Sequence, residues 1–318
     1  MGFDHLMHVR NRYRNKPPNF TELAKKHKRF RELCRITTAG KQTNVVVDFK
    51  DENLVRVLSE TLLEEDFNAR VTLPKDYLVP RIPQRLNYVL VVEDLIELNK
   101  LGKNVVGFDI GTGPACIYPI IALRQNPTWK MYASELDPVS CGYGMANAHR
   151  NFSADQLIVF EADSDNFFKK VLSKTNKITF TMCNPPFFDT EEIDSKFSRL
   201  ANDGKDNSNL VTYTNASTDD QMDVDESARS RTTAQHSELS VDGGEVGFIQ
   251  KMIEESVLYG DKIGIFTTLL GVKASFRELK PAFQQAGIET YNLWTIGQGR
   301  TCRWILAWTL NPQIKLKE

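Results

Sequence analysis

The stretch Asn184-Pro185-Pro186-Phe187 combines residue types that could hold a planar amine for a group transfer. It follows an apolar run, 178–183, which predicts a buried strand. Proline cannot donate a backbone hydrogen bond, so the strand must end there and leave the Asn184 amide and the Pro185 carbonyl at its carboxyl edge. In open α/β sheets, ligands bind at that edge.

Two oxygen acceptors at this edge could aim the lone pair of an exocyclic amine on a nucleobase, which is otherwise delocalised into the ring. The Asn184 side-chain oxygen and the Pro185 carbonyl would each accept one N–H, and Phe187 would stack on the base. No dedicated base is needed for such chemistry. The alternative is a proline-rich turn that Asn184 only caps.

A second group of residues has the spacing of a cofactor site. The run 105–110 predicts a strand that leads through Asp109 into Gly111-Thr112-Gly113, where glycines let a ligand approach the backbone. Ala115 stands where a dinucleotide fingerprint has its third glycine, so the turn alone is weak evidence. Glu135 ends the next predicted strand, where an acidic side chain bonds ribose hydroxyls in doubly wound folds. The alternative for Glu135 is a surface carboxylate.

Helices and strands alternate around these residues. Strands are predicted at 131–135, 157–160, 178–183, 263–270, 289–295 and 302–310, and helices at 87–98, 138–150, from 165, 243–257 and 275–286. An extended linker, 80–88, would precede them, and a glycine-rich basic hairpin, 297–301, would join the last two strands. A closing hairpin places one antiparallel strand in an otherwise parallel sheet.

The first 80 residues are predicted to form a small α/β RNA-binding module. Residues 1–20 of this module are called the basic arm. Residues 1–50 contain 12 Lys and Arg against 4 Asp and Glu, although the whole chain has a net charge of −1. Basic residues alternate with Tyr13 in the arm, which suits phosphate contacts and base stacking; the alternative is a solvated, disordered terminus. Beyond the arm we expect a helix at 20–34, a strand at 43–49 and a helix at 51–67.

The larger domain is expected to run from 81 to 318 and to contain a disordered acidic insertion, 189–242. That segment has no apolar periodicity and holds 13 Asp and Glu against 5 Lys and Arg. The five cysteines form no C-x-x-C pair, which argues against a disulfide framework and a zinc site. Without a signal-peptide pattern or an apolar run of 18 residues, the sequence predicts a soluble intracellular protein.

The order of elements resembles the Rossmann-type class I fold of S-adenosylmethionine-dependent methyltransferases, an α/β fold with a seven-stranded, mostly parallel sheet. Within that fold, the chain resembles the methyltransferase-like 16 family, RNA adenosine N6-methyltransferases of U6 small nuclear RNA with a bacterial relative that acts on ribosomal RNA adenine. The resemblance is carried by residues 8–13, 16–18, 85–88, 92–96, 109–113, 116–119, 183–188 and 298–304. Larger members continue into a C-terminal RNA-binding region, whereas this chain stops at Glu318, and their equivalent of the insertion is commonly shorter and more basic.

The resemblance implies S-adenosylmethionine as the cofactor, U6 or a similar structured RNA as the partner, no metal, a monomer, and a location in the nucleus and also in the cytoplasm. Residues expected to hold the cofactor are Arg85, Asp109, Gly111, Thr112, Gly113, Glu135, Ser164 and Asn184, with Arg85 paired to the methionine carboxylate. Residues expected to hold the adenine are Asn184, Pro185, Pro186 and Phe187. Residues expected to contact RNA are Arg10, Arg12, Arg14, Lys16, Phe188, Arg300 and Arg303.

Two other functions are compatible with parts of the pattern. A protein glutamine N5-methyltransferase would hold a planar amide with the same acceptors, but such enzymes usually have Tyr at the position of Phe187 and lack the basic module. A non-catalytic RNA-binding protein could retain the fold, but the intact 184–187 motif argues against it.

Overall fold

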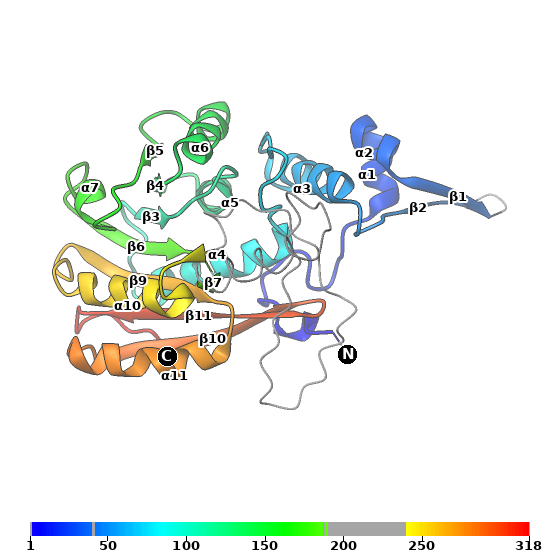
Figure 1. Cartoon of the computed structure of the whole chain (residues 1–318). Coiled ribbons are helices and arrows are strands. Elements are labelled where there is room, and N and C mark those ends of the chain that lie inside the picture. The colour runs from blue at the N-terminus through cyan, green and yellow to red at the C-terminus, as the bar shows by residue number, and fades with distance from the viewer. Residues whose placement is uncertain (1, 40–41, 187, 190–239, 318) are drawn as a thin grey trace, which may run out of the picture.

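A seven-stranded sheet forms the centre of the computed structural model, which describes residues 2–39, 42–186, 188–189 and 240–317 (Figure 1). The strand order is β10-β11-β9-β6-β3-β4-β5. Strands β5, β4, β3, β6 and β9 are parallel, and β11 runs antiparallel to both β9 and β10, which confirms the expected fold class. The bounds are β3 (Val106–Ile110), β4 (Lys130–Glu135), β5 (Leu157–Glu161), β6 (Ile178–Cys183), β9 (Ile263–Leu270), β10 (Thr290–Gln298) and β11 (Thr301–Thr309).

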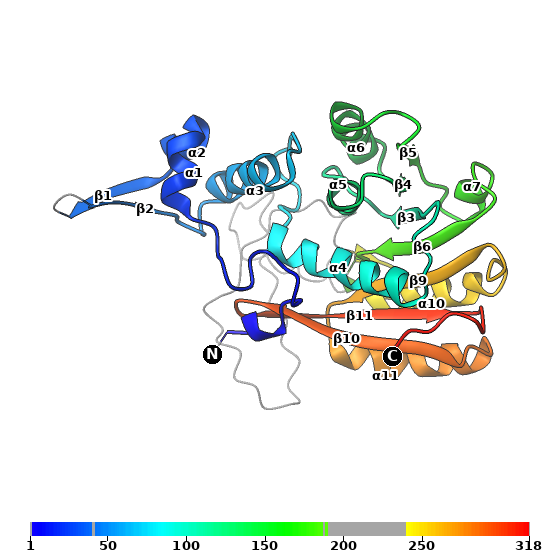
Figure 2. The same cartoon turned by 180° about the vertical axis from the view of Figure 1, so that it is seen from behind.

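Helices cover both faces of the sheet, and each face has its own apolar core (Figure 2). The helices α4 (Ile82–Leu98), α5 (Ile117–Gln125) and α6 (Pro138–Asn151) contribute to one core, and α7 (Lys169–Leu172), α10 (Gly244–Ser256) and α11 (Lys273–Gln285) to the other. Neighbouring strand residues alternate between them: Met131 and Ala133 enter the first core, and Tyr132 enters the second. No helix among the described residues is long and apolar enough to cross a membrane.

The N-terminal residues form a 3-10 helix, three helices and a hairpin. Their bounds are η1 (Asp4–Leu6), α1 (Phe20–Lys26), α2 (Lys28–Leu33), β1 (Arg35–Ala39), β2 (Gln42–Val46) and α3 (Glu52–Phe67). The antiparallel β1–β2 ribbon projects from the body (Figure 1). Apolar residues of α3 share the first core with α4 and α5, so this part of the chain is packed onto the sheet domain.

Three local predictions were wrong. The helix expected at 20–34 is broken at His27, whose backbone is extended, and the strand β1 that follows α2 was not predicted. The strand expected at 43–49 ends at Val46. The linker expected at 80–88 is helical from Ile82 onward, because Pro83 lies in the first turn, where a missing N–H costs nothing. Arg81, the N-cap residue of α4, and Arg85 therefore lie one helical turn apart.

Two short strands flank the segment 190–239, which lies outside the described residues together with the disorder predicted for it. The strand β7 (Phe188–Asp189) directly follows the 184–187 motif and pairs in parallel with β8 (Ser240–Val241). The chain therefore leaves and re-enters the described structure at one place, beside the carboxyl end of β6.

Candidate cofactor and acceptor site

The glycine turn after β3 combines a left-handed backbone conformation with open space in front of it. Gly111 and Gly113 adopt φ values of +67° and +65°, a region that glycine enters without penalty. A Cβ atom added at Gly111 would meet no atom within 4 Å. The Thr112 N–H donates to the Ser134 carbonyl at 2.9 Å and so holds the turn against β4. The turn thus leaves room for a ligand directly over the backbone.

Glu135 lies at the end of β4 and fixes the same turn. Its carboxylate accepts hydrogen bonds from the backbone N–H groups of Gly113 at 2.8 Å, Leu136 at 2.8 Å and Asp137 at 3.0 Å. Burial raises the pKa of Glu135, and these three donors oppose that rise by stabilising the carboxylate. The predicted ribose acid and the predicted glycine turn are therefore in direct contact.

Asp109 lies beneath the turn and is fully buried, and neither of its carboxylate oxygens has a hydrogen-bond partner. Burial raises the pKa of Asp109 to about 7, and the charge of Glu135 adds to the rise. Arg85 opposes it, as does the nearby Thr112 hydroxyl, which also lacks a hydrogen bond of normal geometry. A buried carboxyl without partners is costly to the fold, so it is best explained by a ligand that supplies a donor.

Arg85 joins the cofactor residues to the acceptor motif. Its Nη1 donates to the Tyr118 hydroxyl at 2.6 Å and to the Asn184 side-chain oxygen at 3.2 Å. The guanidinium carbon lies 5.4 Å from the centroid of the Tyr118 ring, while the buried Nε has no partner. Tyr118 was not predicted as a site residue, although it lies in the segment 116–119 that supports the resemblance.

A second tyrosine, Tyr88, is hydrogen-bonded to the end of β6, the strand that leads into Asn184. Tyr88 of α4 is fully buried, and its hydroxyl accepts a hydrogen bond from the Cys183 N–H at 3.2 Å. The same hydroxyl lies 2.6 Å from the Thr267 hydroxyl on the neighbouring strand β9. These two contacts fix the strand end one residue before the predicted acceptor. The sequence placed Tyr88 where the predicted linker 80–88 and the predicted helix 87–98 overlap, and it gave no sign of this role.

The remaining members of the predicted site are less connected. Pro185 is buried and Pro186 is half-buried at the end of β6, as the motif required. Ser164 is exposed after β5, where its hydroxyl donates to Asp165 at 3.0 Å. Phe187 lies outside the described residues, and only the backbone of Phe188 is placed, in β7. The stacking role of Phe187 therefore stays a prediction.

The basic arm is packed against α4 and α3. Arg10 donates to Glu93 at 2.7 Å and to Asp94 at 2.5 Å, and Arg12 lies over the ring of Phe67 and 3.5 Å from Asp66. Burial lowers the pKa of Arg10, but the two carboxylates together raise it by more than burial lowers it, so the net shift of the pKa is upward. These two arginines thus make ion pairs within the protein.

Tyr13 contradicts the expectation that it could stack on a base. Its side chain is buried, and its hydroxyl donates to the Asp66 carboxylate at 2.6 Å. The alternation of Tyr13 with basic residues reflects packing onto α3. The alternative of a disordered arm is also wrong for the described residues 2–17, because Asn11 is buried as well.

The other predicted RNA contacts lie near the tip of the β10–β11 hairpin or on the arm. Arg300 and Lys16 are exposed, Arg14 donates to the His5 carbonyl at 3.3 Å, and Arg303 is half-buried. Burial and the nearby Arg85 both lower the pKa of Arg303. Arg303 therefore lies close to the site residues, at the carboxyl edge of the sheet.

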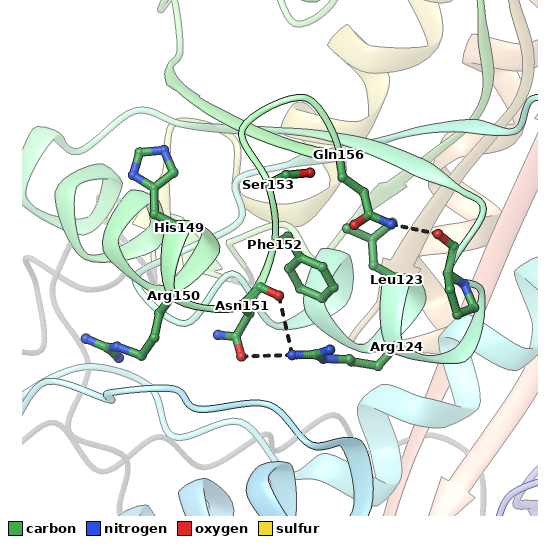
Figure 3. A pocket seen from close by; sticks show the side chains of 9 residues that line it. Leu123, Arg124, His149, Arg150, Asn151, Phe152, Ser153 and Gln156 are labelled. Carbon is green, nitrogen blue, oxygen red and sulfur yellow. Dashed lines mark hydrogen bonds between the residues drawn. The ribbon is translucent and has the colours of Figure 1, made fainter.

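A separate hollow of about 510 Å³ lies where α5 and α6 end and β5 begins, at the opposite edge of the parallel sheet (Figure 3). Arg124 lies over the Phe152 ring at 4.7 Å and bonds the Asn151 side-chain oxygen at 3.3 Å. None of the predicted site residues lines this hollow. Its size therefore does not mark it as the functional site.

Comparisons with known proteins show the family and the fold. A family model described as RNA methyltransferase matches residues 1–312. The U6 small nuclear RNA (adenine-(43)-N(6))-methyltransferase of Caenorhabditis elegans is 40% identical over 323 residues, which cover 99% of this chain and 64% of that protein. The hMettl16 catalytic domain solved with a MAT2A 3′UTR hairpin is 32% identical, with a TM-score of 0.79 and 98% of each chain covered. The N-terminal domain of human METTL16 solved with SAH is 28% identical, with a TM-score of 0.71, 96% of this chain and 99% of that chain covered.

Proposed function

Because the chain belongs to the RNA methyltransferase family, we propose that it transfers a methyl group from S-adenosylmethionine to N6 of an adenosine in RNA. One observation carries the proposal: Arg85 bonds the Asn184 oxygen beside the open Gly111 turn, so cofactor and acceptor residues meet at one sheet edge. The chain spans 64% of the length of its C. elegans relative, and the adenine N6-methyltransferase activity named for that relative supports the choice of N6 of adenine.

The groups at the turn fit S-adenosylmethionine, which supplies an electrophilic methyl group when it is bound. Its methionine part carries an ammonium and a carboxylate, and the orphaned oxygens of Asp109 and the orphaned Nε of Arg85 have the complementary charges. Glu135 would bond the ribose hydroxyls, and Gly111 leaves space for the ligand. Pairing these buried groups removes an unsatisfied state that the ligand-free protein must carry.

Asn184 and Pro185 would orient the amine. The Asn184 side-chain oxygen has a second lone pair besides the one that faces Arg85, and the Pro185 carbonyl follows it at the end of β6. Two acceptors fit an amine with two hydrogens, and an adenine offers such an amine only at N6. Phe187 would stack on the adenine after that base has flipped out of the RNA helix or loop.

An RNA partner is supported by the family and by the hairpin that is bound to the hMettl16 domain. U6 small nuclear RNA, a nuclear and also cytoplasmic location, a monomeric state and a reaction without metal are parts of the proposal. Arg14, Lys16, Arg300 and Arg303 are its proposed phosphate contacts. No group of three or more His, Cys, Asp or Glu in the described part of the chain could hold a metal ion.

The decisive experiment is single-turnover methylation of an RNA with one unpaired adenosine, followed by mass analysis of the nucleosides. We expect N6-methyladenosine, and we expect Asn184→Ala to lower the rate about 10²–10³-fold, because one preorganised polar contact is lost. The affinity for S-adenosylhomocysteine should change much less. Gln250→Ala is a matched control, since that amide is exposed and donates to Glu254 of its own helix.

Four results would contradict the proposal. A wild-type rate for Asn184→Ala, or a methyl group on a ring nitrogen or a ribose oxygen, would rule out the acceptor mechanism. Methylation of a glutamine peptide in place of RNA would identify the protein methyltransferase. RNA binding without any methyl transfer would identify the non-catalytic alternative.

A further inference from the structure

The first residues of the chain are hydrogen-bonded to the tip of the β10–β11 hairpin. The Phe3 N–H donates to the Gly299 carbonyl at 2.5 Å, and the Gly299 N–H donates to the Asp4 carboxylate at 2.8 Å. A Cβ atom at Gly297 would lie 2.6 Å from the Cβ of Phe3, so only glycine permits this approach. Figures 1 and 2 both place η1 beside the tip. We call residues 2–11 the clasp.

The clasp is held from its other side by α4. Asn87 is fully buried, and its side-chain oxygen accepts from the His8 N–H at 2.9 Å and from the Asn11 amide at 2.7 Å. The Asn87 amide nitrogen donates to the Gly297 carbonyl at 3.3 Å. Arg10 adds its ion pairs with α4. The hairpin tip, the clasp and the helix that carries Arg85 are therefore one connected unit.

Three basic residues lie at the hairpin tip or next to it. Arg300 follows Gly299 directly, Arg303 lies on β11, and Arg81, the N-cap residue of α4, donates to the Thr301 hydroxyl at 3.2 Å. Asp4, in contrast, is an acid within residues 1–50, which carry 12 Lys and Arg against 4 Asp and Glu, and it would repel phosphate. Its presence there needs a reason other than charge complementarity with RNA.

We propose that Asp4 positions the hairpin tip for RNA through its hydrogen bond with the Gly299 backbone. This inference rests on the proposed function. By fixing the tip against the clasp, Asp4 presents Arg300 and Arg303 in one arrangement before RNA arrives. A two-residue tip that is already ordered loses less conformational entropy on binding than a tip that must be ordered by the ligand. Asp4 therefore strengthens the binding of a polyanion although its own charge opposes it.

The test uses the full chain and a labelled RNA hairpin with one unpaired adenosine. We expect Asp4→Ala to weaken RNA binding about fivefold, the size of one lost hydrogen bond. An electrostatic effect alone has the opposite sign, because removing a carboxylate near phosphates tightens binding. Asp4→Asn keeps an oxygen acceptor for the Gly299 N–H without the charge, so it should bind RNA at least as tightly as the wild-type protein.

Two further readouts separate positioning from a general loss of structure. Amide hydrogen exchange in 297–301 should be faster in Asp4→Ala and unchanged in Asp4→Asn, while the affinity for S-adenosylhomocysteine stays at the wild-type value in both. Gly297→Ala, which pushes Phe3 away from the tip, should weaken RNA binding in the same direction as Asp4→Ala.

The inference is overturned if Asp4→Ala binds RNA as tightly as or more tightly than the wild-type protein, or if Asp4→Asn loses as much affinity as Asp4→Ala. If the wild-type protein binds no RNA, the proposed function fails as well. Faster exchange at the tip of Asp4→Ala would then assign Asp4 to the fold alone, and the two failures stay distinguishable.

Discussion

The basic arm and the cofactor site use their charged residues in opposite ways. In the arm, Arg10 and Arg12 are paired with carboxylates of α4 and α3, and Tyr13 bonds Asp66. At the site, both oxygens of Asp109 and the Nε of Arg85 are buried without partners. An unpartnered buried polar atom costs about 1–3 kcal/mol, so such atoms survive where a ligand completes them. Charge in the arm therefore stabilises the fold, and charge at the site is kept for a ligand.

The largest effect on the cofactor site is expected from a side chain that fills the space over the Gly111 turn. Gly111→Arg should abolish binding of S-adenosylhomocysteine, a loss of more than about 100-fold, because a side chain would enter the ligand space at a φ that L-residues rarely adopt. Isothermal calorimetry gives the affinity. Gly287→Arg is the matched control, since Gly287 has a φ of +65° and a Cβ atom there would also meet no atom within 4 Å, but it lies on the exposed surface after α11. Undiminished binding by Gly111→Arg would show that the cofactor lies elsewhere.

The orphaned carboxyl gives a pH-dependent test. Because the pKa of Asp109 is raised to about 7 in the fold, the ligand-free protein holds an extra proton between about pH 4 and 7, and its free energy of unfolding falls as the pH rises through that window. An ammonium ligand favours the ionised form, so the affinity for S-adenosylhomocysteine should rise as the pH passes 7.

Asp109→Asn separates the two effects. It should raise the melting temperature of the ligand-free protein at pH 8, remove the pH dependence of the affinity near pH 7, and weaken binding above pH 7. Glu135 and Arg85 are the charged groups that act on Asp109, and burial keeps the nearby thiol of Cys116 protonated by raising its pKa. Calorimetry at pH 6, 7 and 8 measures both quantities. An affinity of the wild-type protein that does not change with pH would contradict the assignment of Asp109 to the ammonium.

The smallest expected effects distinguish two arginines of the arm. Arg10→Ala should lower the free energy of unfolding by a few tenths to about 1 kcal/mol, because it breaks half-exposed ion pairs with Glu93 and Asp94. Its effect on the salt dependence of RNA binding should be small, since those carboxylates already neutralise it. Arg14 bonds a backbone carbonyl, so Arg14→Ala should flatten the log–log salt slope by up to about one. Equal slopes for the two variants would show that Arg10 also contacts phosphate.

The sequence was sufficient wherever local patterns decide the structure. The apolar run 178–183 is β6 residue for residue, and the turn at Gly111 meets Glu135 as the doubly wound pattern requires. Both rest on neighbours close in the chain or on a rule about sheet edges.

The parts that could not be predicted depend on partners far apart in the chain. Tyr13 is buried because Asp66 accepts its hydroxyl, and nothing near Tyr13 in the sequence indicates that. The prolines around 80–88 suggested an extended linker, although Pro83 is compatible with a first helical turn. The role of Tyr118 required the long-range approach of Arg85, which depends on where α4 begins.

The pairing of β7 with β8 has a consequence for how this fold can vary. Since Phe188 and Ser240 are neighbours in that pair, the segment between them begins and ends at the same point. When the ends of a flexible connection are already joined, doubling its length costs only about 0.6 kcal/mol of closure entropy. The pairing of β7 with β8 holds both ends of the segment at one place, so its length can change without moving the strand that presents Asn184.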